Sequence, residues 1–318
     1  TAYEISLGLV GSEMCIRDSN CGVWLELSTG NEISENFLDN NAIGIELWIS
    51  SNNKITQNIM ISGGLNVYHS YNNLVVDNFV NNKPLVYLEN ESNISIEDAG
   101  QVILIKCEHI VVKNLTLHNL YLAIELWETN CSTLLTNTLL DNTMGIWLSL
   151  SKNNSLIGNT LENNSYFAIG LASSTSNTII GNNIKINTIG IKLDLASSNY
   201  IYHNNFIDNT YQFYSHCSTN VWDDGYPSGG NYWSDYNGTD LYSGIFQNET
   251  GSDGIGDTPY VIDENNVDNY PLIYPYGYTP TPDISQDGIV DIYDLILIAS
   301  AYGSRPGFPR WNPYADLN

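Results

Sequence analysis

Asparagine recurs along this chain at a spacing close to 22 residues. Three residues before each of these asparagines lies an apolar side chain, and another usually follows two residues after it, as in Ile179, Asn182 and Ile184. A repeat of this length is too short for paired helices and fits one turn of a β-solenoid. The period therefore predicts an all-β chain wound into coils. The asparagines that define it are Asn36, Asn58, Asn78, Asn114, Asn137, Asn159, Asn182 and Asn204.

Each coil opens with glycine or alanine and alternating apolar residues, as in Gly145-Ile146-Trp147-Leu148, and then turns through a corner rich in serine and asparagine. Such alternation indicates short strands joined by tight turns. In stacked coils, equivalent side-chain amides lie about 4.8 Å apart and can hydrogen-bond as a ladder. We therefore expect a structural ladder through the eight asparagines, with Thr116 the one polar residue at an apolar flank. The longer gap between Asn78 and Asn114 predicts an inserted segment from Glu89 to Ala99.

This pattern resembles the PbH1 repeats of the NosD-like family of parallel β-helix proteins, over about residues 20–215. Residues 219–274, which contain the letters NVWDDGYPSGGNYW, resemble the segment that closes many NosD-like surface proteins. The resemblance implies a right-handed parallel β-helix over residues 20–218 and a C-terminal cap over residues 219–274. It also offers a copper-maturation accessory protein as one alternative function. Copper favours clustered His, Met and Cys ligands, and these residues are scattered here.

A Pro/Thr linker, residues 275–282, leads into a motif with the spacing of a calcium loop. Ca²⁺ needs six or seven hard oxygen ligands around a sharp glycine turn, which Gly288 provides. Aspartate at the last position resembles a dockerin repeat, and residues 315–318 resemble the start of a second, incomplete one. For residues 283–318 this implies a Ca²⁺-dependent module with a cohesin-type protein partner; the alternative is an acidic turn that binds nothing. The predicted metal ligands are Asp283, Ser285, Asp287, Ile289 through its carbonyl, Asp291 and Asp294.

Residues 219–274 concentrate aromatic and acidic side chains, which admits two interpretations. A cap would cover the open end of the solenoid, where an exposed coil edge invites aggregation. Alternatively, aromatic faces stack on sugars and clustered aspartates bind calcium. The candidate carbohydrate contacts are Trp222, Tyr232, Trp233 and Tyr236, and the candidate second metal site is Asp253, Asp257 and Asp263.

The chain carries 35 acidic and 10 basic residues, a formal net charge of −25. That charge repels nucleic acid and anionic membranes, and no apolar stretch is long enough to span a membrane. Enzymes with a similar fold act on acidic polysaccharides with a basic residue beside acidic ones. Between residues 20 and 304 there is no arginine, and no lysine lies beside an acidic triplet. Asp223 and Asp224 are adjacent and would point to opposite faces of a strand, so we assign no catalytic residue.

Two further expectations concern the N-terminal segment and the cysteines. Residues 1–19 are expected to be non-native, because residues 4–19 resemble a translated sequencing-adapter remnant; the natural N-terminus and any signal peptide would then be missing. The five cysteines fit neither a zinc site nor a disulfide framework. Free thiols are expected, with a Cys107–Cys131 disulfide as the alternative.

The sequence thus predicts a non-catalytic extracellular or cell-surface β-helix. It would act as a scaffold or contact polysaccharide, and its dockerin-like tail would attach it to a cohesin-type partner. A polysaccharide lyase or glycoside hydrolase of the β-helix type is the alternative from another functional class.

Overall fold

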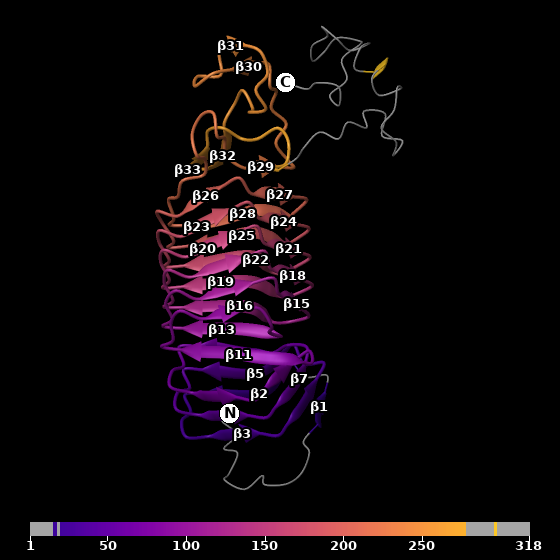
Figure 1. Ribbon diagram of the computed structural model, residues 1–318, viewed down its shortest axis with the longest axis vertical. Helices are drawn as coiled ribbons and strands as arrows, with labels where there is room; N and C mark the ends of the chain where they lie inside the picture. Colours follow the sequence, from indigo (N-terminus) through magenta and orange to yellow (C-terminus); the bar gives the residue numbers. More distant parts are fainter. Residues whose placement is uncertain (1–14, 18–19, 278–295, 298–318) are drawn as a thin grey trace.

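The structure is a computed structural model that describes residues 15–17, 20–277 and 296–297. The chain winds into a right-handed parallel β-solenoid of about nine coils of about 22 residues, and Figure 1 shows the coils stacked along the long axis of the molecule. The predicted all-β solenoid is confirmed. The helical tail stays a prediction, since only residues 296–297 of it are described. Within the described ranges, no helix has the length and apolar character needed to cross a membrane.

The first stack of coils, residues 20–82, has three walls of short parallel strands. The first wall ends in β8 as an edge strand, and β1 extends the third wall at its outer end. The strands are β2 (Cys21–Glu26), β5 (Ile43–Trp48) and β8 (Leu65–Tyr68); β3 (Glu32–Ser34), β6 (Lys54–Thr56) and β9 (Leu74–Val76); and β1 (Cys15–Arg17), β4 (Phe37–Asp39), β7 (Ile59–Ile61) and β10 (Phe79–Val80).

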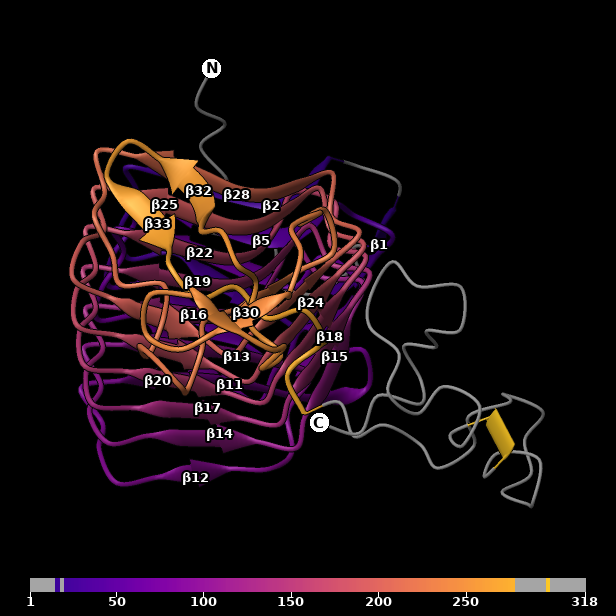
Figure 2. The same ribbon diagram turned by 90° about the horizontal axis from the view of Figure 1, so that it is seen from above.

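The second stack, residues 83–218, also has three walls, and Figure 2 looks along its axis. The first wall is β11 (Lys83–Glu89), β13 (Gln101–Ile105), β16 (Leu122–Trp127), β19 (Met144–Ser149), β22 (Phe167–Ala172), β25 (Ile189–Asp194) and β28 (Tyr211–His216). The second is β12 (Ser95–Ile96), β14 (Val111–Lys113), β17 (Thr133–Leu135), β20 (Ser155–Ile157), β23 (Thr178–Ile180) and β26 (Tyr200–Tyr202). The third is β15 (Thr116–His118), β18 (Thr138–Leu140), β21 (Thr160–Glu162), β24 (Asn183–Lys185) and β27 (Asn205–Ile207).

The two stacks meet where the chain reverses direction. β10 and β11 pair antiparallel, with Phe79 opposite Pro84 and Val80 opposite Lys83. The third wall of the first stack therefore continues into the first wall of the second stack as one eleven-stranded sheet. The predicted inserted segment holds β12, which begins the second wall.

Side chains from the second stack cover the exposed edge of β8. The Gln101 side-chain oxygen accepts a hydrogen bond from the Leu65 amide at 2.9 Å, and its Nε2 donates to the carbonyls of Leu65 at 2.7 Å and Leu122 at 2.8 Å. Gln101 is completely buried. At Leu65, one side-chain amide thus makes the hydrogen bonds to β8 that a neighbouring strand would make.

The predicted asparagine ladder exists as two runs, one in each stack, and it needs one correction. The runs are Asn36, Asn58 and Asn78, and Asn137, Asn159, Asn182 and Asn204. Asn159 donates to Asn182 and accepts from Asn137, each at 2.9–3.0 Å, and its Nδ2 also donates to the Leu134 carbonyl. Asn114 does not belong to the ladder: it is exposed, and the residue in register with Asn137 is the buried Leu115. With Leu115 in that position the apolar flanks become Val112 and Leu117, and Thr116 ceases to be an exception.

The ladders reach further than the sequence pattern indicated. Asn204 donates to Asn231 at 3.0 Å, which adds a rung from the C-terminal segment. Ladders at other corners run through further sets of asparagines and a set of hydroxyl side chains. They are Asn31, Asn53 and Asn73; Asn154, Asn177, Asn199 and Asn220; and Thr129, Ser151 and Ser174. A third further set of asparagines is Asn142, Asn164, Asn187 and Asn209.

The segment after residue 218 covers the end of the coils, as Figure 1 shows in orange. Trp233 stacks between Phe206 at 4.3 Å and Tyr260 at 4.3 Å, so aromatic rings close the core. The buried Asp268 accepts from the Trp233 indole at 2.9 Å and from the Asn231 amide at 2.8 Å. The strands here are β29 (Tyr232–Trp233), which pairs with β27, and the antiparallel pairs β30 (Tyr242–Ser243) with β31 (Glu249–Thr250) and β32 (Tyr260–Asp263) with β33 (Asn266–Asp268).

Candidate functional site

An aromatic pocket lies on the outward face of the second stack, next to the edge of β8. Its cavity measures about 180 Å³. Strands of both stacks line it, so it exists only because the two stacks meet. The lining residues, which define the aromatic pocket below, are Trp48, Asn66, Val67, Tyr68, Tyr121, Leu122, Glu125, Trp127, Met144, Trp147, Tyr166, Phe167 and Lys192.

Glu125 is the buried polar group of this pocket. It lies on the outward face of β16 in register with Ile103 and Trp147, but the pocket walls leave it only 2% exposed. The Val67 amide hydrogen-bonds to its carboxyl group. The other oxygen, Oε2, is buried without a hydrogen-bond partner. Burial raises the pKa of Glu125 to about 8, and the Val67 hydrogen bond offsets only part of that rise. The side chain is therefore mostly protonated at neutral pH.

Aromatic rings form the walls of the pocket on both sides of Glu125. On the β8 side, the rings of Trp48 and Tyr68 stack at 4.0 Å, and Tyr68 meets the edge of Trp127 at 5.4 Å. On the other side, Trp147 packs on Phe167 at 5.4 Å. Rings arranged in this way offer flat, partly exposed faces to a ligand.

Gly170 gives the Trp147 indole its room. A Cβ on Gly170 would lie 2.5 Å from Cε3 of Trp147 and 2.8 Å from the Phe167 ring. Neither contact is possible without a shift of the rings, so the bare backbone of β22 is what allows the indole to lie where it does. Gly170 thus shapes one wall of the pocket.

Lys192 is the cation of the pocket. Its Nζ donates to the Tyr166 hydroxyl at 2.9 Å and lies 4.9 Å from the centre of that ring and 6.0 Å from the centre of Trp147. None of the ion pairs found among the described residues includes Lys192, whereas Lys54, Lys83, Lys113 and Lys185 each pair with a carboxylate. Lys192 is therefore held over aromatic rings by cation–π attraction.

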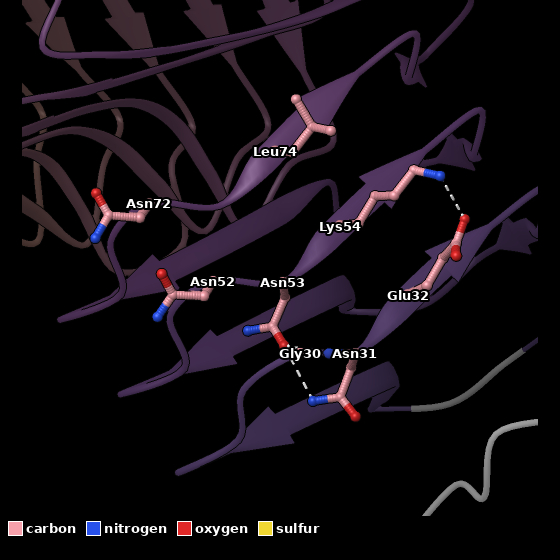
Figure 3. A pocket seen from close by; sticks show the side chains of 8 residues that line it. All are labelled: Gly30, Asn31, Glu32, Asn52, Asn53, Lys54, Asn72 and Leu74. Atoms are coloured by element: carbon pink, nitrogen blue, oxygen red, sulfur yellow. Dashed lines mark hydrogen bonds and ion pairs between the residues drawn. The ribbon is translucent and has the colours of Figure 1, made fainter.

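A second depression, shown in Figure 3, runs across the corners of the first stack. Its polar groups already bind one another. Lys54 pairs with Glu32 at 2.7 Å, and Asn31 donates to Asn53 at 3.0 Å as part of a ladder. It is wide and shallow and has no aromatic lining, so we regard it as solenoid surface.

The aromatic residues predicted to contact carbohydrate lie in the cap. Trp222 and Trp233 are 1% exposed, so their faces cannot reach a ligand, and this part of the prediction is wrong. Both indole N–H groups are used inside the cap, by Asn266 and Asp268. Tyr232 and Tyr236 are half-buried, and the Tyr236 hydroxyl donates to the Thr258 carbonyl at 2.7 Å.

The structure does not bring Asp253, Asp257 and Asp263 together as a ligand set. Asp257 accepts from Thr239, Leu241 and Tyr242, whereas Asp253 accepts from Gln247 and Ile255, and Asp263 accepts from Asn265 and Asn266. In the described part of the chain, no three His, Cys, Asp or Glu residues gather to hold a metal. The predicted calcium loop, from Asp283 to Asp294, lies outside the described residues.

Four of the five cysteines fall within the described side chains, and all four are free thiols: Cys21, Cys107, Cys131 and Cys217. Cys107 is buried in the hydroxyl ladder, where its amide donates to Thr129, and Cys131 is exposed at a corner. At the N-terminus, β1 pairs with β4, and Ile16 lies opposite Leu38. This pairing does not test whether residues 1–19 are native, so that expectation stays a prediction.

The stacked coils, the side-chain ladders and the walls of parallel strands together define a parallel β-helix protein. The family model for the periplasmic copper-binding protein NosD matches residues 9–101 and 64–238, which is more than half of the chain. The chain belongs to the NosD family.

Other comparisons are remote. Among solved structures, the periplasmic alginate epimerase AlgG is 16% identical, with a TM-score of 0.34 over 60% of this chain and 50% of that chain. The A-module of the Azotobacter vinelandii mannuronan C-5 epimerase AlgE6 is 14% identical, with a TM-score of 0.31 over 63% of this chain and 59% of that chain. This chain therefore spans one half to three fifths of their lengths. A search of curated proteins found no match.

The sequence contained a signal for the aromatic pocket. Glu125, Trp147 and Lys192 occupy the same position in their coils, so the period alone places them in one outward column. What the period did not indicate is the cover supplied by β8, because that depends on the antiparallel junction. If the packing of β8 is left out, the sequence predicts that Glu125 is an ordinary exposed residue.

Proposed function

We propose that this NosD-family protein is an extracellular or periplasmic carbohydrate-binding β-helix whose glycan site is the aromatic pocket. The observation that carries the proposal is a cavity walled by seven Trp, Tyr and Phe rings, with a buried carboxyl group at Glu125 and a cation at Lys192. Sugar rings present apolar C–H faces to aromatic side chains and hydroxyl groups to a few well-placed polar groups. A mostly apolar pocket with few polar groups is the usual form of a small-molecule site.

A glycan array with the full chain tests this proposal. Trp147→Ala removes a pocket wall and should abolish or strongly weaken binding. Trp24→Ala is a matched control, because Trp24 occupies the same coil position on β2 but is 58% exposed and is not one of the lining residues. Binding that is lost equally in both variants, or in neither, would contradict the pocket as the glycan site.

We also propose that the tail attaches the protein to a cohesin-type partner through Ca²⁺. Support comes from the sequence alone: six oxygen ligands between Asp283 and Asp294 at calcium-loop spacing, with Gly288 at the turn. Isothermal titration of the full chain with Ca²⁺ should give a heat that Asp287→Ala removes. Asp257→Ala separates this site from the cap aspartates, and a heat that only Asp257→Ala removes would refute the tail site.

A polysaccharide lyase or hydrolase is the alternative, and Glu125 is the observation that favours it, because a carboxyl group held protonated can donate a proton to a leaving group. Assays for new reducing or unsaturated ends on the glycans that bind would separate enzyme from binding module. The family description names copper. Among the residues that the structure describes, no cluster of His, Cys, Asp or Glu favours copper binding, and it is not part of this proposal.

A further inference from the structure

We propose that Cys217, His216 and Asp194 form a reactive thiol site, in which His216 activates the Cys217 thiol for exchange with the disulfides of low-molecular-weight thiols. The three residues lie where β25 and β28, the last two strands of the first wall, end and the chain turns the corner. This site is separate from the aromatic pocket, so glycan binding can hold or fail independently of it.

The pairing of β25 with β28 brings Asp194 and His216 together. The two residues are partners in the parallel register, and both side chains lie on the outer side of the wall. Nδ1 of His216 lies 2.9 Å from Oδ1 of Asp194. An ionised carboxylate only accepts hydrogen bonds, so Nδ1 carries the proton, and Nε2 of the neutral ring is left as an acceptor. Asp194 thus fixes both the tautomer and the orientation of the imidazole ring.

Cys217 follows directly at the corner, and its Sγ lies 3.5 Å from Nε2 of His216. The thiol is a donor, and this nitrogen is the acceptor that faces it. A nucleophile, a base within hydrogen-bond reach and a third group that orients the base are together the arrangement of an activated cysteine. The site is open to solvent: Cys217 is exposed, and the side chains of His216 and Asp194 are 58% and 46% exposed. A small disulfide can therefore approach Sγ.

The solenoid itself does not require a cysteine at this corner. Each coil of the second stack turns here through a residue with a left-handed φ, and Cys217 has a φ of +48°. The residues in register with Asp194 in the two preceding coils are Ala172 and Ser149, so the base and the group that orients it are not part of the repeat either. The residues that hold the corner position in earlier coils are Glu128, Leu150, Ser173 and Leu195.

Exchange with a disulfide needs no group beyond these three. As Sγ of Cys217 attacks one sulfur of the disulfide, a new S–S bond forms, the old S–S bond breaks, and the Cys217 proton moves to Nε2 of His216. The leaving thiolate then takes that proton from the imidazolium, whose charge Asp194 stabilises in the meantime. Cys217 is thereby oxidised to a mixed disulfide, and the other half of the reactant is reduced to a free thiol. Such disulfides persist in oxidising spaces outside the cytoplasm.

The experiment uses dithiodipyridine, an uncharged disulfide that releases a coloured thione when it reacts. In the folded full chain at neutral pH, Cys217 should react about tenfold faster than Cys131, because an ordinary cysteine is only a few per cent thiolate there and gains from a base that takes its proton. Cys131 is the matched control: it is exposed at a corner with a φ of +51°, and its thiol has no hydrogen-bond partner among the described residues. Cys217→Ser and Cys131→Ser assign the two kinetic phases.

Variants of His216 and Asp194 separate activation from mere exposure. His216→Asn should slow Cys217 to the rate of Cys131, because an amide cannot take the proton. Asp194→Asn should also slow it, since an amide N–H that donates to Nδ1 selects the tautomer with the proton on Nε2, and Asp194→Glu should restore most of the rate. In the denatured chain the two thiols should react equally. Equal rates in the folded wild type, or a Cys217 that stays tenfold faster in His216→Asn, would overturn the proposal.

Discussion

At the scale of single residues, Glu125 has the strongest predicted effect on how stability depends on pH. Its folded pKa of about 8 lies above the ordinary value of 4.5, so the folded state binds a proton that the unfolded state releases. Its contribution to stability is present below about pH 4.5 and is lost as the pH rises through about 8. The loss amounts to at most about 5 kcal/mol. Denaturant titrations should therefore show a free energy of unfolding that falls from mildly acidic to mildly alkaline pH.

Glu125→Gln should flatten that decline without abolishing it. Burial also raises the pKa of Asp268 to about 7 and that of Asp240 to about 6, and both contribute with the same sign. The slope that remains in the variant belongs to these cap residues. An unchanged slope would mean that Glu125 is ionised in the folded protein at neutral pH.

Gly170→Ala tests the shape of the pocket at the smallest possible scale. The added methyl group would lie 2.5 Å from the Trp147 indole, which must move. Overpacking of this kind costs about 1–3 kcal/mol. We expect a changed tryptophan fluorescence spectrum and weaker glycan binding in a protein that still folds. Gly158→Ala serves as a comparison: it is unfavourable for a different reason, a backbone φ of +63° that strains alanine, and it lies at a corner outside the pocket. A spectrum altered equally by both variants would count against the role of Gly170.

At the scale of elements, the ladder makes each asparagine depend on its neighbours. Asn159 is completely buried and makes side-chain hydrogen bonds to Asn137, Asn182 and the Leu134 carbonyl. Asn159→Ala leaves several of those partners unpaired and should reduce the free energy of unfolding by about 3 kcal/mol. Asn114→Ala should reduce it by only about 1 kcal/mol, because Asn114 is exposed and the variant loses one hydrogen bond, from Thr136, and the ease with which asparagine adopts a φ of +57°. Comparable losses in the two variants, measured by denaturant unfolding, would restore Asn114 to the ladder.

The Asn114 correction indicates how far sequence reasoning reaches at this scale. Period and apolar flanks were enough to predict the coils, the walls and the main ladder, because these are local and repeat. In one coil, Asn114 lies one residue before the ladder position. The sequence pattern pointed to Asn114 because of its residue type, although the apolar flanks favour Leu115 for the ladder position. The aromatic pocket could not be predicted in the same way, since β8 and β16 are brought together by a reversal at β10 and β11 that no repeat encodes.

The cap shows the same limit from the other side. Its aromatic and acidic composition suited either a ligand site or a closure, and composition alone could not separate them. For Trp222 and Trp233, the 1% exposure decides in favour of closure, because their indoles pack as a continuation of the core. The pocket that aromatic residues line lies instead on the outward face of the solenoid.

At the scale of the whole molecule, the two stacks are the natural units of unfolding. In a solenoid each coil is stabilised mainly by its nearest neighbours, so a weak interface divides the array. Within a stack, consecutive coils pair along all three walls. At the junction the backbone pairing reduces to the short β10–β11 pair and an isolated bridge from Gly63 to Leu120, supplemented by the Gln101 side chain on β8.

Gln101→Ala should therefore weaken the coupling between the stacks more than it weakens either stack. It removes three hydrogen bonds and leaves the amide and carbonyl of Leu65 unpaired. Hydrogen exchange followed by mass spectrometry should show faster exchange in β2 to β9, with β17 to β27 nearly unchanged. The aromatic pocket should loosen with the junction, since Trp48 and Tyr68 belong to the first stack and Trp147 to the second. Gln57→Ala, at an exposed corner of the first stack, should do neither. Exchange that rises evenly along the whole chain in Gln101→Ala would mean that the solenoid unfolds as one unit, and that the pocket does not depend on how the two stacks meet.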